Sequence, residues 1–179
     1  LVSKRQPRVL DVGTGSGCIA VTLACERPDL EVVATDISPR ALEVARENAL
    51  RLGAARSISF KLGPLFEPVT SETFDLVVSN PPYVSDADSQ VDPQVSLWEP
   101  EEAVYAGPTG TEVISALLRG APDHLTEAGR LILEIGHGQG DRLFDLAETT
   151  GMTCVETVPD LAGILRVGVF RKSGSAVRL

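Results

Sequence analysis

Short apolar runs alternate with segments of helical periodicity along most of the chain. Each of the first five runs is four to six residues long and is followed by turn-forming residues. Strands are predicted at 9–12, 31–36, 57–62, 74–79 and 130–135, and helices at 16–27, 38–52, 111–121 and 141–150. This alternation is typical of an α/β fold in which helices cover a mostly parallel sheet.

The helix predicted at 38–52 has local signals at both ends. Ser38 is a suitable N-cap with Pro39 in the first turn, and Gly53 ends the segment. The apolar residues recur three or four positions apart, at Leu42, Ala45, Ala49 and Leu52. That spacing predicts one buried face.

The chain ends with two strand candidates, 154–158 and 164–171, that lie too close for a helix between them. Parallel neighbours need a crossover of about a dozen residues, so we expect an antiparallel hairpin. The fold prediction is a doubly wound, Rossmann-like, mostly parallel seven-stranded sheet with a C-terminal antiparallel hairpin. Residues 81–110 show neither helical nor strand periodicity. A loop of that length after a strand is typical of a functional site.

The composition favours one globular domain over residues 1–179, without a membrane-spanning segment. The formal net charge of −9 argues against nucleic-acid partners, which bind clustered Lys and Arg. Cys18, Cys25 and Cys154 lack the spacing of a metal or redox motif, and predict free, buried thiols in the reducing cytoplasm. The two histidines are far apart in sequence, so no metal site is expected.

A glycine-rich loop follows the first strand and reads Asp11-Val12-Gly13-Thr14-Gly15-Ser16-Gly17. Glycines let a ligand approach the main chain. A dinucleotide fingerprint would place its third glycine at position 18, whereas these glycines alternate after an acid. That pattern suits S-adenosylmethionine, whose amino-acid end is small and zwitterionic, and Asp36 is placed to accept its ribose hydroxyls. The alternative is a tight turn without a ligand, and the loop alone does not separate this cofactor from NAD.

The motif Asn80-Pro81-Pro82-Tyr83 follows the fourth strand directly. Two prolines remove two backbone donors, so the turn offers acceptors: the Asn80 side-chain oxygen and the Pro81 carbonyl. Two acceptors beside the ring of Tyr83 suit a planar NH2 group. Drawing both N–H bonds toward them favours a pyramidal nitrogen, so positioning can drive methyl transfer without a strong base. The alternative is a proline strand stop with a packed tyrosine.

These motifs resemble the class I S-adenosylmethionine-dependent methyltransferases with NPPY. The resemblance is strongest to the protein-(glutamine-N5) methyltransferases of the HemK/PrmC type, which act on peptide chain release factors. The matching segments are VLDVGTGSGCIAV (9–21), ATDISPRAL (34–42), LVVSNPPYV (76–84), WEPEEAV (98–104), LTEAGRLILEIGHGQG (125–140) and DLAGILRVGVF (160–170).

The resemblance implies transfer of the cofactor's methyl group to N5 of a glutamine in a release factor, leaving S-adenosylhomocysteine. It places the cofactor on Gly13, Thr14, Gly15, Ser16, Gly17, Asp36 and the Asn80 position, with an adenine contact near Leu65. We also expect Asp11, the acid before the glycines, to belong to the cofactor site. It places the substrate glutamine on the segment from Asn80 to Tyr83.

Two departures from the family accompany the resemblance. The family usually reads G-D-[LWF]-F where this chain has Gly63-Pro64-Leu65-Phe66, so Pro64 supplies no acid for the adenine amine. The family also has an N-terminal helical region that helps to hold the release factor, and we expect this sequence to lack it. In the loop, we expect Trp98 and Tyr105 to act either as a lid over the glutamine or as anchors, and Glu99 to order the loop.

Two alternatives to glutamine methylation stay open. One is a nucleic-acid amino-methyltransferase acting on adenine N6 or guanine N2. It is disfavoured because residues 75–118 contain no Lys or Arg, and a flipped base needs its phosphates held. The other is a cofactor-binding module without catalysis.

Overall fold

The computed structural model of the chain describes residues 6–87 and 100–174. They form two compact units. The N-terminal unit contains the described residues of Leu1–Ser79 together with Asp123–Arg130. The C-terminal unit contains those of Asn80–Pro122 and Leu131–Leu179.

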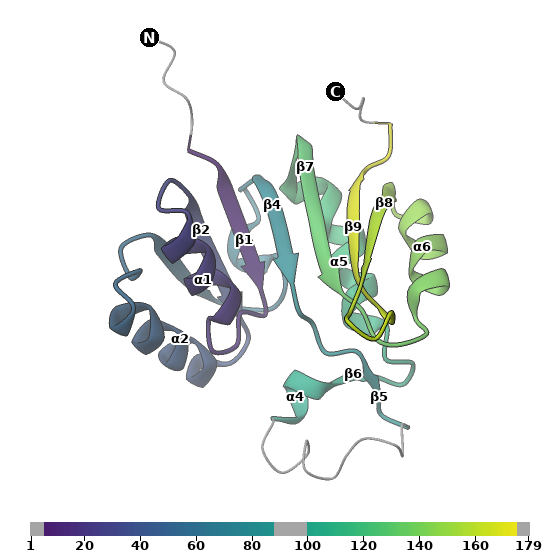
Figure 1. Cartoon of the computed structure of the whole chain (residues 1–179), viewed down its shortest axis with the longest axis horizontal. Coiled ribbons are helices and arrows are strands. Elements are labelled where there is room, and N and C mark those ends of the chain that lie inside the picture. Colours follow the sequence, from purple (N-terminus) through teal and green to yellow (C-terminus); the bar gives the residue numbers. More distant parts are fainter. Residues whose placement is uncertain (1–5, 88–99, 175–179) are drawn as a thin grey trace. The chain divides into compact units, whose positions relative to one another are not determined.

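The N-terminal unit is built on parallel strands with helices packed along them (Figure 1). Parallel pairing joins β1 to both β2 and β4, and β2 to β3. Ser38 accepts a hydrogen bond from the Ala41 amide at 3.4 Å, which confirms it as the N-cap of α2. The elements are β1 (Arg8–Val12), α1 (Cys18–Glu26), β2 (Glu31–Asp36), α2 (Pro39–Arg51), β3 (Ile58–Leu62), the 3-10 helix η1 (Glu67–Val69) and β4 (Phe74–Ser79).

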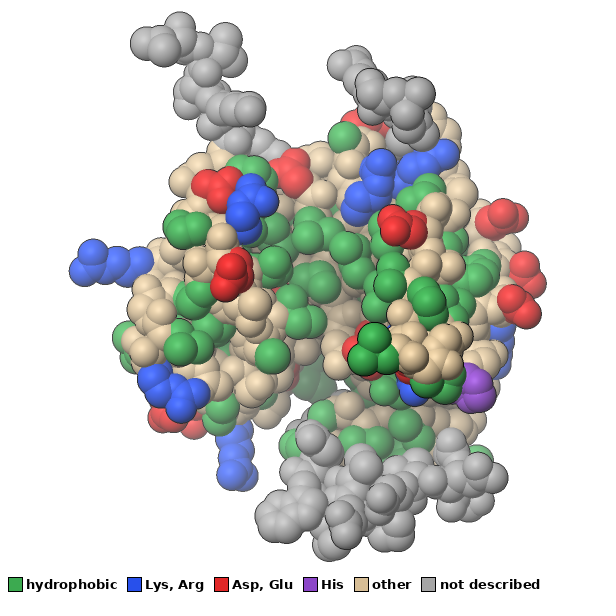
Figure 2. All heavy atoms as spheres, viewed as in Figure 1, with side chains coloured by type: hydrophobic (Ala, Val, Ile, Leu, Met, Phe, Trp, Pro, Cys, Tyr) green, Lys and Arg blue, Asp and Glu red, His purple; other side chains and the backbone are tan. Residues whose placement is uncertain are grey.

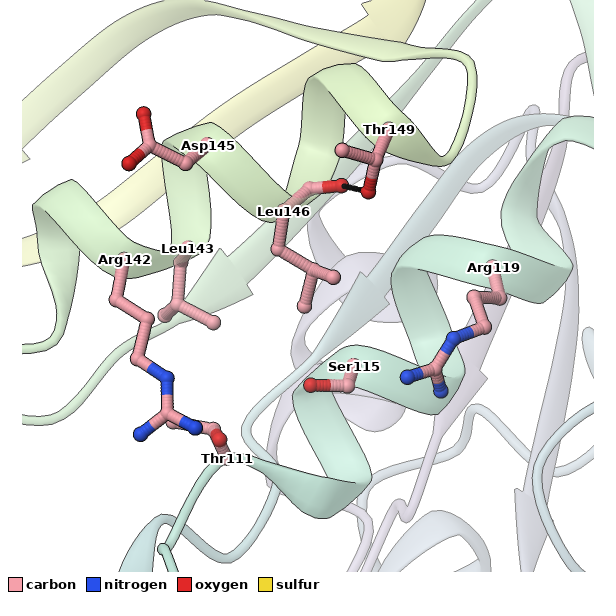
Figure 3. Close-up of a pocket in the computed structure, with 8 residues that line it drawn as sticks. All are labelled: Thr111, Ser115, Arg119, Arg142, Leu143, Asp145, Leu146 and Thr149. Atoms are coloured by element: carbon pink, nitrogen blue, oxygen red, sulfur yellow. Dashed lines mark hydrogen bonds between the residues drawn. The ribbon is translucent and has the colours of Figure 1, made fainter.

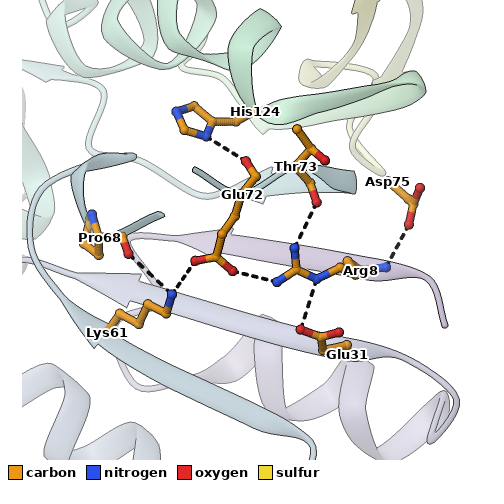
Figure 4. Close-up of polar contacts among 8 residues, drawn as sticks. All are labelled: Arg8, Glu31, Lys61, Pro68, Glu72, Thr73, Asp75 and His124. Atoms are coloured by element: carbon orange, nitrogen blue, oxygen red, sulfur yellow. Dashed lines mark hydrogen bonds and ion pairs between the residues drawn. The ribbon is translucent and has the colours of Figure 1, made fainter. Parts of the chain in front are cut away.

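A charged network links β1, β2 and β3 to the segment before β4 (Figure 4). Arg8 donates to Glu72 at 2.6 Å and to Glu31 at 3.0 Å, and Lys61 also donates to Glu72. The Arg8 guanidinium lies 4.9 Å from the centroid of the Phe74 ring. Burial alone would raise the pKa of the Glu72 carboxyl, but the hydrogen bonds from Lys61 and Arg8 outweigh burial and lower it. The network therefore depends on an ionised Glu72.

The C-terminal unit contains a small parallel pair and a hairpin. β5 pairs with β6 through Val84 and Tyr105. β8 and β9 are antiparallel, with Met152 opposite Lys172, and β9 is also antiparallel to β7. Helix α5 and strand β7 have residues in both units. The elements are β5 (Val84–Ser85), α4 (Glu101–Val104), β6 (Tyr105–Gly107), α5 (Glu112–His124), β7 (Leu125–Glu134), α6 (Gly140–Thr149), β8 (Met152–Pro159) and β9 (Leu165–Lys172).

The larger sheet has seven strands in the order β3-β2-β1-β4-β7-β9-β8. The mostly parallel sheet and its closing antiparallel hairpin confirm the predicted fold class. No helix in the described ranges is both long enough and apolar enough to cross a bilayer.

Several local predictions are wrong. The segment 81–110, expected to lack regular structure, contains β5, α4 and β6, because strands and helices of two to four residues leave no periodic signal. Cys18 and Cys25 are exposed, and Cys154 is only partly buried. Helix α1 buries a single side through Ala20, Val21 and Ala24, and its uniformly apolar sequence does not show which side that is.

Candidate active site

The glycine loop between β1 and α1 adopts backbone conformations that favour glycine. Gly15 has φ of 57°, and no protein atom lies within 4 Å of the position that a Cβ would occupy there. Gly17 has φ of 82°, and a Cβ would lie 3.0 Å from the Ala45 Cβ of α2. The loop therefore approaches α2 closely at Gly17 and leaves open space at Gly15. Both features fit a ligand bound against the main chain.

Asp11 is buried beneath this loop, with 1% of its surface exposed. Its Oδ2 accepts from the Thr14 hydroxyl at 2.6 Å and from the Ala20 amide at 3.1 Å. Its Oδ1 is also buried and has no hydrogen-bond partner among the described residues. Burial raises the pKa of the Asp11 carboxyl to about 6, and the charge of Asp36 adds to this increase. Asp11 is thus a buried carboxylate with one oxygen, Oδ1, that accepts no hydrogen bond from the described residues.

Asp36 ends β2 and connects two backbone segments. Its Oδ2 accepts from the Gly15 amide at 2.8 Å, and its Oδ1 accepts from the Ser38 amide at 2.9 Å. A carboxylate oxygen has about two acceptor positions, so each still has one for a ligand hydroxyl. The backbone amides of Gly15 and Ser38 therefore hold the Asp36 carboxylate in a fixed orientation at the end of β2.

Leu65 follows β3 and is strained, with φ of 47°. Its carbonyl accepts from the Thr35 hydroxyl at 3.3 Å, and the neighbouring Gly63 amide donates to the Asp36 carbonyl at 2.9 Å. Pro64 between them is exposed. The structure thus brings the segment after β3 to the ends of β1 and β2, where open α/β sheets bind ligands.

Asn80 lies next to the glycine loop because it directly follows Ser79 in the chain. Ser79, the last residue of β4, donates its hydroxyl to the Val12 carbonyl at 2.7 Å, directly before the glycine loop. Asn80 follows by one peptide bond and is exposed. The N-terminal unit therefore places the residues predicted for the cofactor at the carboxyl ends of β1, β2 and β3, with Asn80 next to the end of β4. A buried carboxylate oxygen without a partner, open backbone and an oriented Asp36 fit a ligand with an ammonium group and ribose hydroxyls.

The remainder of the Asn80–Tyr83 turn belongs to the C-terminal unit. Pro81 is buried and Tyr83 is half-buried. The Tyr83 hydroxyl donates to Glu134 of β7 at 3.4 Å. Burial raises the pKa of the Tyr83 hydroxyl, and the Glu134 charge raises it further. The Gln139 side chain donates to the Tyr83 carbonyl at 2.9 Å.

Glu134 and Gln139 were missed as functional candidates. Both lie within the matching segment 125–140, but they contact Tyr83 across 51 and 56 positions of sequence. Trp98 and Glu99 lie outside the described residues. The prediction that Trp98 acts as a lid or as an anchor therefore stays a prediction. Tyr105, the other residue of that prediction, begins β6 and is half-buried.

A cavity of about 370 Å³ lies between α5 and α6 (Figure 3). Its lining includes Thr111, Ser115, Arg119, Arg142 and Leu143. None of the predicted cofactor or substrate residues lines this cavity. The described ranges contain no group of three or more His, Cys, Asp or Glu side chains arranged for a metal ion.

The methyltransferase small domain family model matches residues 1–98 of the chain. The chain belongs to that family. The match covers the glycine loop, Asp36 and the Asn80–Tyr83 turn, so the residues assembled above lie inside the family's own region.

Two relatives from bacteria are similar over most of the chain. A release factor glutamine methyltransferase from Cereibacter sphaeroides is 49% identical over 87% of this chain and 56% of its own length. A release factor glutamine methyltransferase from Xylella fastidiosa is 42% identical over 93% of this chain and 60% of its own length. The chain thus spans a little over half the length of these relatives.

A solved structure supports the fold. The ribosomal protein L11 methylase from Lactobacillus delbrueckii subsp. bulgaricus has a TM-score of 0.68 and is 22% identical, over 96% of this chain and 72% of its own. At this identity the likeness concerns the methyltransferase fold alone.

Proposed function

We propose that this chain is the methyl-transferring domain of an S-adenosylmethionine-dependent protein-glutamine methyltransferase that acts on peptide chain release factors in the cytoplasm. One observation carries the proposal. The turn Asn80-Pro81-Pro82-Tyr83 begins one residue after Ser79, which is hydrogen-bonded to Val12 directly before the glycine loop. The names of the relatives support the choice of substrate.

The N-terminal unit would hold the cofactor. Asp11 would accept from the ammonium group, because its unpaired Oδ1 gains a cationic partner. Asp36 would accept from the ribose hydroxyls while it keeps its bonds to the Gly15 and Ser38 amides. Leu65 would contact the adenine ring, and Pro64 would offer no side-chain acceptor to the adenine amine. When bound, S-adenosylmethionine supplies an electrophilic methyl group whose C–S bond breaks as the new N–C bond forms.

The Asn80–Tyr83 turn would hold the glutamine carboxamide. The Asn80 side-chain oxygen and the Pro81 carbonyl accept its two N–H groups, so the nitrogen lone pair is directed away from the acceptors. An amide nitrogen is a poor nucleophile because its lone pair is delocalised, and this arrangement reduces that delocalisation. The nitrogen becomes more acidic as it is alkylated, so its proton leaves to solvent without a strong base. Tyr83, held by Glu134, packs beside the carboxamide.

Charge favours a polypeptide over a nucleic acid as the acceptor. Residues 75–118, which include the Asn80–Tyr83 turn, contain no Lys or Arg. On the face drawn in Figure 2, Lys and Arg side chains lie singly among Asp and Glu side chains, apart from one group at the upper right. A nucleic acid needs several phosphates neutralised close to the flipped base. A neutral or basic peptide loop has no such requirement.

Methyl transfer from labelled S-adenosylmethionine tests the proposal. A glutamine-containing release factor and an oligonucleotide are compared as acceptors, with mass spectrometry to locate the methyl group. Asn80→Ala should bind the cofactor within about twofold of wild type but lose roughly 10²-fold or more of the rate, because an acceptor aimed at the reacting nitrogen is removed. Asn80→Asp keeps an acceptor oxygen and should lose less. Equal rates for wild type and Asn80→Ala, or labelling of the oligonucleotide alone, would contradict the proposal.

A further inference from the structure

Gln139 uses every hydrogen-bonding group of its side-chain amide on the segments around the Asn80–Tyr83 turn. Its Nε2 donates to the Tyr83 carbonyl at 2.9 Å and to the Gly110 carbonyl at 3.1 Å. Its Oε1 accepts from the Gly136 amide at 3.0 Å. The two carbonyls can only accept and the amide can only donate, so this orientation of the carboxamide is the one that satisfies all three.

The side chain of Gln139 does not serve its own helix. Gln139 is the N-cap residue of α6, yet its side chain makes no capping hydrogen bond. A residue at this position usually contributes to stability by accepting from the first turn of the helix. Here the amide is directed instead to Tyr83, 56 positions earlier in the chain.

The backbone packs closely around the same turn. Gly110 has φ of 73°, and a Cβ there would lie 2.7 Å from the Tyr83 carbonyl oxygen. A Cβ at Gly136 would lie 2.8 Å from Gln139 Oε1 and 3.1 Å from Cδ2 of the Tyr83 ring. Tyr83 is therefore enclosed by two glycines and fixed by one amide, with its hydroxyl on Glu134.

The prolines alone do not fix the turn. They set φ at two successive residues but leave the orientation of Tyr83 and its carbonyl open. Gln139 supplies the missing constraint, and it binds the Tyr83 carbonyl, not the Pro81 carbonyl that the substrate would need.

We propose that Gln139 is a positioning residue for the substrate carboxamide: its amide locks Tyr83 between the Gly110 and Gly136 segments, so that the Asn80 and Pro81 acceptors keep a fixed geometry. This inference rests on the proposed function. The residue acts through the turn and touches neither the cofactor nor the reacting atoms.

Gln139→Glu is the sharpest variant. It keeps the shape and the acceptor for Gly136, but an ionised carboxylate cannot donate and faces two carbonyl oxygens. We expect kcat for methylation of a release factor to fall by about tenfold to a hundredfold, as displacement of a positioned group does. Binding of S-adenosylmethionine, measured by calorimetry, should stay within about twofold, which also shows that the variant is folded. Glu148→Gln, the reverse exchange at an exposed position of the same helix, controls for charge and should leave kcat unchanged.

The pH profile separates positioning from general destabilisation. In the Gln139→Glu variant, protonation of the introduced carboxylate restores one O–H donor, and the two facing carbonyl oxygens favour protonation. The ratio of Gln139→Glu to wild-type kcat should therefore rise as pH falls from neutral toward the pKa of the introduced carboxylate, whose ordinary value is about 4.3 and which the two carbonyl oxygens raise. Gln139→Ala cannot recover a donor and should show a constant ratio.

Asn80→Ala, measured in parallel, distinguishes the two proposals. Loss of rate in Asn80→Ala together with unchanged kcat in Gln139→Glu, or with a pH-independent ratio, would overturn the role of Gln139 alone. Full rate in Asn80→Ala would overturn the proposed function itself.

Discussion

Replacing Asp11 with Asn tests how a buried carboxylate divides its effect between stability and cofactor binding. Asp11 is enclosed beneath the glycine loop and accepts two hydrogen bonds on one oxygen. Asparagine has nearly the same shape and can accept both bonds through its side-chain oxygen. The substitution therefore removes the titratable group while it retains the local structure.

The magnitude follows from the pKa of the Asp11 carboxyl, which rises from an ordinary 3.8 to about 6. Between these values the folded state holds a proton that the unfolded state has released, so the free energy of unfolding falls as pH rises. The stabilisation is fully present below 3.8 and is lost as pH passes about 6. One pKa unit corresponds to about 1.4 kcal/mol, so ionisation of Asp11 costs the folded state about 3 kcal/mol.

Urea unfolding followed by circular dichroism at a series of pH values measures this effect. Relative to wild type, Asp11→Asn should gain about 2.5 kcal/mol of unfolding free energy between pH 4 and pH 7.5. Asp145→Asn, which neutralises an exposed carboxylate of α6, is the control and should show no comparable gain. If the curves for wild type and Asp11→Asn run parallel over this range, the reasoning about burial is refuted.

The same substitution, Asp11→Asn, should lower the affinity of the protein for S-adenosylmethionine. The cationic ammonium of S-adenosylmethionine favours the ionised form of Asp11, so wild-type affinity should rise as pH increases through about 6. Asp11→Asn should bind more weakly at neutral pH, with less dependence on pH. Calorimetric titration at matched ionic strength checks both statements, and equal affinities at neutral pH would exclude Asp11 as a partner of the ammonium group.

Two further substitutions test other carboxylates. Asp36→Ala should weaken S-adenosylmethionine binding by about 10- to 100-fold, because it removes both the oriented hydroxyl acceptor and the hydrogen bond from the Gly15 amide. Calorimetry with Asp145→Ala as the control measures this change. An affinity within twofold of wild type would contradict it. Glu72→Gln should lose about 1–3 kcal/mol of unfolding free energy at pH 7, because Arg8 and Lys61 lose an ionised partner. The pKa of the Glu72 carboxyl is lowered in the folded state, so this difference should diminish as acid protonates the wild type, and a difference that is independent of pH would count against the network.

The elements with strong local signals could be predicted from the sequence. β2 spans Glu31–Asp36 as expected, and Ser38 and Gly53 mark the ends of α2, because caps are encoded within a few neighbouring residues. Leu42, Ala45 and Ala49 form the predicted buried face, but the prediction is wrong for Leu52, which is the C-cap residue and is 58% exposed. The start of β7 at Leu125 was missed, since its first residues include exposed polar ones. β5 and β6 were missed because each is stabilised by its partner about twenty positions away in sequence.

The candidate site divides in the same way. The glycine loop, Asp36 and the Asn80–Tyr83 turn are continuous motifs whose chemistry can be read residue by residue. The support for the turn is not continuous. Gln139 contacts Tyr83 and Gly110 from 56 and 29 positions away, and only the folded chain shows that its amide serves them.

In the proposed mechanism, the methyl-bearing sulfur of the cofactor faces the carboxamide held by Asn80. A crystal structure of the protein with S-adenosylhomocysteine and a glutamine-containing peptide tests it most directly. We predict that the carboxamide nitrogen donates to the Asn80 side chain and to the Pro81 carbonyl, with its opposite side facing the sulfur. A sulfur directed away from Asn80, or a glutamine bound elsewhere, would contradict the account.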